Sequence, residues 1–270
     1  MKLDRALAVA AVCLLAAAVA VGVGKWRGAS HRQAPPRLDA EPGSASLLVV
    51  GVEGLEPRVY ERLLAEGKLP NLARLVSGGA VVMFPSLAQG TDPRIGWTSL
   101  VTGVTPERQG VGSLVRSSKG NMVPLALRPS SRTVDTVWTV LSKTGTRVAV
   151  LGWPGTWPVE QVDGLMVGPY ETYVLERAHG GARADAVYPP EAYAAVDSLV
   201  RTADSYRRIS LSRFVKTDSA LGLEALSGYN IEVLTKSCAA DTTLLNLARF
   251  AVARRGATAL FVFLHGLDQM

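Results

Sequence analysis

The chain has 270 residues, of which 48% are hydrophobic, so it is long enough to bury a full α/β core in one large domain or two small ones. The net charge is +6, but the Lys and Arg residues are scattered without interleaved aromatic residues, which argues against a nucleic-acid-binding role. Its two cysteines, Cys13 and Cys238, are too few for a disulfide framework, and Cys238 is expected to be a small, buried apolar residue.

Residues 1–27 predict a membrane-targeting element. The apolar run 6–24 has basic residues on both sides, and its length is close to the roughly 20 residues that a helix needs to span a bilayer. We expect an uncleaved signal-anchor that leaves the body outside the cytoplasm, in the periplasm or the extracellular space. The alternative is a cleaved signal peptide and a secreted protein. Residues 28–45, which are rich in Pro, predict a flexible linker.

The run LLVVGVEGLEP, residues 47–57, predicts a buried strand that ends in an acidic residue and opens into a helix. An apolar run without alternation is typical of a parallel strand that is covered on both faces. Functional groups gather at the carboxyl ends of such strands, and Glu53 occupies that position. Glu53 is therefore a candidate metal ligand, and the alternative is an acidic helix cap.

Helices are predicted in the stretch that follows this strand. Residues 56–66 carry apolar side chains on one helical face and end at Gly67, and residues 70–76 begin a second helix after a proline. A loop rich in Gly, Thr and Pro then leads into a short apolar helix at 97–101.

Two helix–strand units follow farther along the chain. Ser131 or Thr133 is expected to cap a helix that precedes a strand at 147–151. Asp241 is expected to cap another helix, which precedes a strand at 259–264. Alternating helices and strands of this kind indicate an α/β fold with a mostly parallel sheet.

Several stretches, taken together and in order, resemble the type I phosphodiesterase and nucleotide pyrophosphatase family of the alkaline phosphatase superfamily. GKLPNLARLVSGGA (67–80) resembles the family's "G-x-(L/M)-P-N-(L/F)" segment, and GWTSLVTGVTPERQGV (96–111) resembles its "W-T-(S/T)-(L/I)-x-T-G" stretch. Residues 133–168 are similar to its "W-x-x-L-x-x-x-G" helix, the following strand and a "P-x-T-x-P" loop. VYPPEAY (187–193) and FVFLHGLD (261–268) continue the match.

The resemblance implies an alkaline phosphatase-like α/β domain over residues 46–270, a three-layer sandwich with a mostly parallel central sheet that is incomplete in this chain. Residues 168–235 are expected to form a cap or insertion. It also implies two divalent metal ions, Zn²⁺ or alternatively Mn²⁺, and hydrolysis of a small phosphorylated substrate, a phosphodiester or a pyrophosphate, through a covalent Thr or Ser intermediate.

By this resemblance, Glu53 matches an aspartate that binds the metal on the side of the nucleophile, with one methylene more. Thr91 is the candidate nucleophile, although a one-residue insertion is needed to align it. Asp92 is the alternative occupant of that position, which would leave a carboxylate and no nucleophile. Thr98 and Ser99 are expected to be packing or capping residues of the helix.

Asp268 aligns with an aspartate that binds the second metal, and the alternative is an acid in the turn after a strand. His265 and His179 match no ligand position, and Gln109 stands where relatives often have His. The family's later Asp-His pair and its further His have no counterpart in the chain.

Two candidate carboxylates without a matching imidazole cannot complete a two-metal cage, so the chain as given is expected to be inactive. The preferred explanation is that it is an N-terminal fragment of a membrane-tethered hydrolase. The alternative is a degenerate, non-catalytic envelope protein that binds a phosphorylated ligand in the former active-site cleft.

Overall fold

The computed structural model describes residues 46–83, 92–110, 114–116, 122–124, 128–170, 183–203 and 228–268. All of them belong to one unit of the chain, residues 39–270. The targeting element and linker predicted for residues 1–45 lie outside the described residues. Among the residues in the ranges above, no helix is both long enough and apolar enough to span a membrane.

Five strands form the central sheet, in the order β1-β7-β4-β5-β6. Their bounds are Leu47–Val52 (β1), Val148–Leu151 (β4), Gly164–Val167 (β5), Val187–Tyr188 (β6) and Ala259–Leu264 (β7). Strands β1, β7, β4 and β5 are parallel, and the edge strand β6 is antiparallel to β5. Strands β2 (Leu114–Arg116) and β3 (Met122–Pro124) form a separate antiparallel pair.

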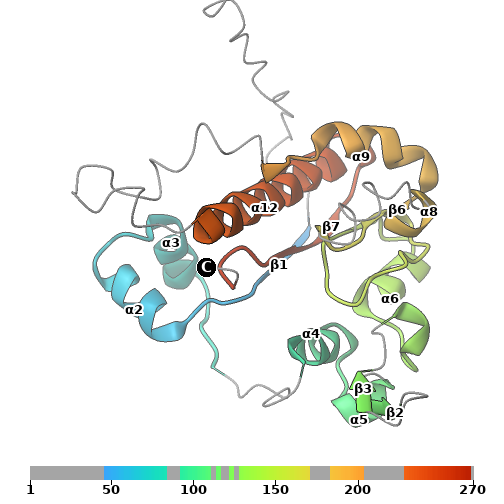
Figure 1. The fold of residues 1–270 in the computed structure, drawn as a ribbon, viewed down its shortest axis with the longest axis horizontal. Coiled ribbons are helices and arrows are strands. Elements are labelled where there is room, and N and C mark those ends of the chain that lie inside the picture. Colours follow the sequence, from blue (N-terminus) through green and yellow to red (C-terminus); the bar gives the residue numbers. More distant parts are fainter. Residues whose placement is uncertain are drawn as a thin grey trace, which may run out of the picture. The chain divides into compact units, whose positions relative to one another are not determined.

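Helices cover both faces of this sheet (Figure 1), so the predicted α/β class with a mostly parallel sheet is confirmed. Helix α12 (Gly228–Arg255) packs over β7, β4 and β5, while α4 (Pro93–Thr102) and α6 (Val137–Lys143) lie on the opposite face. The other described helices and 3₁₀ turns are α2 (Pro57–Ala65), α3 (Pro70–Gly78), α5 (Pro106–Gln109), η1 (Pro129–Ser131), α8 (Arg183–Ala186), η2 (Pro190–Ala192) and α9 (Tyr193–Leu199).

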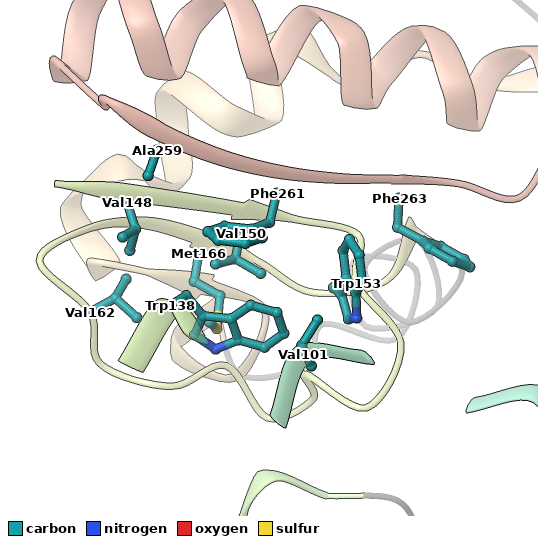
Figure 2. Close-up of a cluster of buried hydrophobic side chains, with 10 residues drawn as sticks. All are labelled: Val101, Trp138, Val148, Val150, Trp153, Val162, Met166, Ala259, Phe261 and Phe263. Carbon is teal, nitrogen blue, oxygen red and sulfur yellow. The ribbon is translucent and has the colours of Figure 1, made fainter. Parts of the chain in front are cut away.

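The core between the sheet and α6 is rich in aromatic side chains (Figure 2). Phe261 and Phe263, two residues apart on β7, project to the face opposite α12, as strand alternation requires. Trp138 of α6 and Trp153 after β4 are fully buried against them. The Trp138 ring lies 5.5 Å from Phe261 and 5.9 Å from Trp153, both in edge-to-face geometry. These rings attach α6 to the sheet.

Strand β1 is less buried than its apolar sequence predicts. Val49 packs against the aromatic core, but Leu48 and Val50 on the other face are 61% and 47% exposed. The prediction that both faces of the strand are covered is therefore wrong for β1. It is correct for β4 and for most of β7, whose residues are buried. The main contacts of α12 are with β7, β4 and β5, and β1 lies at the edge of the sheet.

Three helix starts also differ from the predictions. Helix α4 begins at Pro93, four residues before the expected start at 97, because Asp92 caps it. Helix α6 is capped by Thr136, whose hydroxyl accepts a hydrogen bond from the Thr139 amide at 3.4 Å, and not by Ser131 or Thr133. Helix α12 begins at Gly228, so Asp241 lies inside the helix and does not cap it. The range 168–235, expected to be a cap or insertion, supplies β6 to the sheet edge, and much of that range lies outside the described residues.

Candidate functional site at the ends of β1 and β7

The carboxyl ends of β1 and β7 meet at one edge of the sheet. The two strands are parallel neighbours, with Val52 opposite Leu264. The ladder continues one residue further, because the Glu53 amide donates to the Leu264 carbonyl at 2.9 Å. Glu53 therefore lies beside the turn that follows β7, residues 265–268.

The turns after these strands are in close contact. Gly54 has a φ of +77°, a left-handed conformation that suits glycine. A Cβ atom at this position would lie 2.6 Å from the Asp268 amide nitrogen, which is too close for any real side chain. The Asp268 amide in turn donates to the His265 carbonyl at 3.1 Å. The structure thus brings the two predicted metal ligands, Glu53 and Asp268, to neighbouring positions.

Helix α4 forms a further wall of this site. Gly51 of β1 has no side chain, and a Cβ there would lie 3.2 Å from the Trp97 ring and 2.7 Å from Phe263. This space lets Trp97 pack edge-to-face on Phe263, with ring centroids 4.8 Å apart. In that position the Trp97 indole N–H reaches the Glu53 carboxylate, 3.4 Å from its Oε1 atom.

The Glu53 carboxylate is held in an environment that disfavours its charge. Partial burial raises the pKa of Glu53 above its usual value, and the negative charges of Asp268 and, less strongly, Asp92 raise it further. The hydrogen bond from Trp97 and the nearby His265 act in the opposite direction and lower this pKa. Several ionisable groups therefore act on one another at this edge of the sheet.

Asp92 caps α4. Its carboxylate accepts a hydrogen bond from the Arg94 amide at 3.0 Å and pairs with the Arg94 guanidinium, whose Nε atom lies 2.8 Å from Oδ1. The hydrogen bond from the Arg94 side chain is the main reason that the pKa of Asp92 is lowered. Thr91, the predicted nucleophile, lies outside the described residues. Glu53 is not a helix cap, because Glu56 caps α2 through the Arg58 amide.

Three polar residues near α4 have structural roles. The Thr98 hydroxyl donates to the Arg94 carbonyl at 2.8 Å, and the buried Ser99 hydroxyl lies 3.4 Å from Oε1 of Gln109. Both residues are packed in the helix, as predicted. Gln109 is fully buried, and its side-chain amide donates to the Ile95 carbonyl at 3.3 Å. Gln109 therefore connects α5 to α4 through this hydrogen bond, and its buried side chain does not line an open site.

His265 is the site residue that the sequence analysis missed. It is only 9% exposed and follows the last residue of β7 directly, and its charge acts on Glu53. Its place at the carboxyl end of a buried parallel strand could have identified it. The other histidine of the body, His179, lies outside the described residues.

The donor chemistry here fits a divalent cation only in part. Carboxylate oxygens and imidazole nitrogens are the usual ligands of Zn²⁺ outside thiolate sites. Among the residues that the structure describes, however, no group of three or more His, Cys, Asp or Glu side chains is arranged to hold a metal ion. Glu53 and Asp268 can supply part of a coordination shell, and its other ligands would have to come from outside the described residues.

Comparison with known proteins identifies one family. The family model of the type I phosphodiesterases and nucleotide pyrophosphatases matches residues 47–248, which is more than half of the chain and includes β1, α4 and most of α12. No curated protein and no solved structure matches the chain.

Proposed function

The chain belongs to the type I phosphodiesterase and nucleotide pyrophosphatase family, and we propose that it is a metal-dependent hydrolase of phosphodiester or pyrophosphate bonds. The observation that best supports metal dependence is the placement of Glu53 and Asp268 in neighbouring turns that follow adjacent parallel strands. The charge of Asp268 raises the pKa of Glu53. A cation bound by both carboxylates would remove that repulsion.

In the proposed reaction, the Thr91 hydroxyl attacks the phosphorus atom of a small phosphorylated substrate. The P–O bond to the leaving group breaks, and water then hydrolyses the phosphothreonine ester and restores the hydroxyl. Two bound divalent cations, Zn²⁺ or Mn²⁺, would neutralise phosphoryl oxygens and lower the pKa of the attacking hydroxyl. Glu53 and Asp268 would hold metal, and the hydrogen bond from the Trp97 indole would orient the Glu53 carboxylate.

The proposed enzyme acts outside the cytoplasm, tethered to the membrane by residues 1–27. The apolar run 6–24 supports this location, since its length suits a bilayer-spanning helix. The second candidate function is that of a non-catalytic protein that binds a phosphorylated ligand at the same edge of the sheet. One specific observation favours it: no group of three metal-ligating side chains is found in the described parts of the chain.

The test is hydrolysis of a nitrophenyl phosphodiester by the purified protein, with Zn²⁺ or Mn²⁺ added. We expect turnover that stops when the metal is chelated and falls at least about 10³-fold in Thr91→Ala. Thr105→Ala, which removes an exposed hydroxyl at the start of α5, serves as the matched control and should retain the wild-type rate. Phosphate binding without turnover, unchanged in Thr91→Ala, would instead identify the binding protein.

A further inference from the structure

The turn after β7, residues 265–268, is held on two sides. On one side it packs against Gly54, where a Cβ would lie 2.6 Å from the Asp268 amide nitrogen. On the other side the Gly266 amide donates a hydrogen bond to Oδ1 of Asp241 in α12, at 3.3 Å. The turn that carries His265 and Asp268 therefore contacts both the turn after β1 and helix α12.

The contact between Asp241 and Gly266 depends on the residue at both positions. Asp241 lies in the interior of α12, far from either end, where aspartate is a poor helix former and has no capping role. A Cβ at residue 266 would lie 2.4 Å from Oδ2 of Asp241, so only glycine lets the carboxylate come this close. Helix formation alone does not account for an aspartate at position 241.

We propose that Asp241 is a positioning residue, which fixes the 265–268 turn through the Gly266 amide and thereby places Asp268 for metal binding. The inference rests on the proposed function, in which Asp268 is a metal ligand. Asp241 acts through the turn and does not itself touch the metal or the substrate. Groups that orient metal ligands in this way commonly change metal affinity or activity by about 10-fold to 100-fold when they are removed.

Three variants of the full chain test this role. Asp241→Ala removes the acceptor, and Asp241→Asn keeps an acceptor oxygen of the same shape without the charge. Glu232→Ala is the matched control, because Glu232 is a half-exposed acid of α12 that pairs with Lys236. The readouts are amide hydrogen exchange of residues 264–268 in metal-free protein, Mn²⁺ affinity by electron paramagnetic resonance, and global stability by urea unfolding.

In Asp241→Ala we expect amide exchange at Gly266 to rise at least about 10-fold and Mn²⁺ affinity to fall about 10-fold to 100-fold. In Asp241→Asn both should recover to near wild type, and Glu232→Ala should change neither. Unchanged exchange in Asp241→Ala at equal global stability, or an Asn variant as defective as the Ala variant, would overturn the role of Asp241. Failure of the wild type to bind Mn²⁺ would count against the proposed function, whereas the exchange data would still decide whether Asp241 holds the turn.

Discussion

Glu53 is longer by one methylene than the aspartate that the family resemblance leads one to expect at the end of the first strand. In the structure this length brings its Oε1 atom to 3.4 Å from the Trp97 indole nitrogen. Part of its charge is thus compensated by a neutral donor, while Asp268 and Asp92 oppose that charge. A half-buried carboxylate beside like charges is unfavourable in the protein without metal.

Replacing Glu53 with Gln should therefore stabilise the metal-free protein at neutral pH. Because the pKa of Glu53 is raised on folding, the stability that its protonated form contributes is fully present below the ordinary value of 4.5 and is lost as the pH rises through the folded value. The free energy of unfolding, measured with a chelator present, should differ between Glu53→Gln and wild type at pH 7 and converge near pH 4. Glu61→Gln, at an exposed position of α2, is the control. A difference that is the same at both pH values would contradict this account.

Glu53 could be predicted at the residue scale because it stands where an apolar strand ends, whereas Asp268 was assigned from the family resemblance. The structure brings the two residues to neighbouring turns. His265 was not identified, since it matches no ligand position of the family. Asp241 was read as a helix cap, because aspartate favours caps and the sequence does not reveal a tertiary contact 25 positions away at Gly266.

Among the helices, the stability of α4 depends on its N-cap residue, Asp92. Asp92→Ala removes the acceptor for the Arg94 amide and should lower the free energy of unfolding by about 1 kcal/mol. Asp92→Asn should recover most of this loss, since Asn caps as well as Asp does, although it loses the ion pair with Arg94. Urea unfolding measures both variants. Equal stability of Asp92→Ala and wild type would show that the cap does not matter.

Helix α6 offers a second test within one element. Trp138 is fully buried against Trp153 and Phe261, so Trp138→Ala should destabilise the protein by about 3 to 5 kcal/mol. Val140, two residues along the same helix, is 48% exposed, and Val140→Ala should cost less than about 1 kcal/mol. Thermal and urea unfolding give both numbers, and similar losses for the two variants would refute the assignment of the core.

Among the elements, the long apolar strands and the helices with clear stop signals were predicted well. Strand β7 has the expected bounds, and α2 and α3 lie where proline starts and an apolar face indicated helices. Strands β5 and β6 were not predicted, because they have only four and two residues and owe their conformation to pairing with neighbours. The start of α12 was missed for a similar reason: packing on the sheet extends the helix beyond the cap signal at Asp241.

For the whole molecule, the family assignment agrees with the mostly parallel sheet and its two helical layers. The order of the strands could not be predicted. Strand β1 pairs with β7, the last described strand, and no local pattern reports a contact between segments so far apart in the sequence. The adjacency of Glu53 and Asp268, on which the proposed chemistry depends, is a property of that topology.

The central claim is that Glu53 and Asp268 act as one metal-binding pair in phosphodiester hydrolysis. It is tested most directly by kcat/KM for a nitrophenyl phosphodiester with saturating Mn²⁺, measured for wild type, Glu53→Gln, Asp268→Asn and the double variant. We expect each single variant to lose at least about 10²-fold and the double variant to lose little more than the worse of the two, because residues that act as a unit are not additive. Wild-type, metal-dependent turnover in either single variant would contradict the claim.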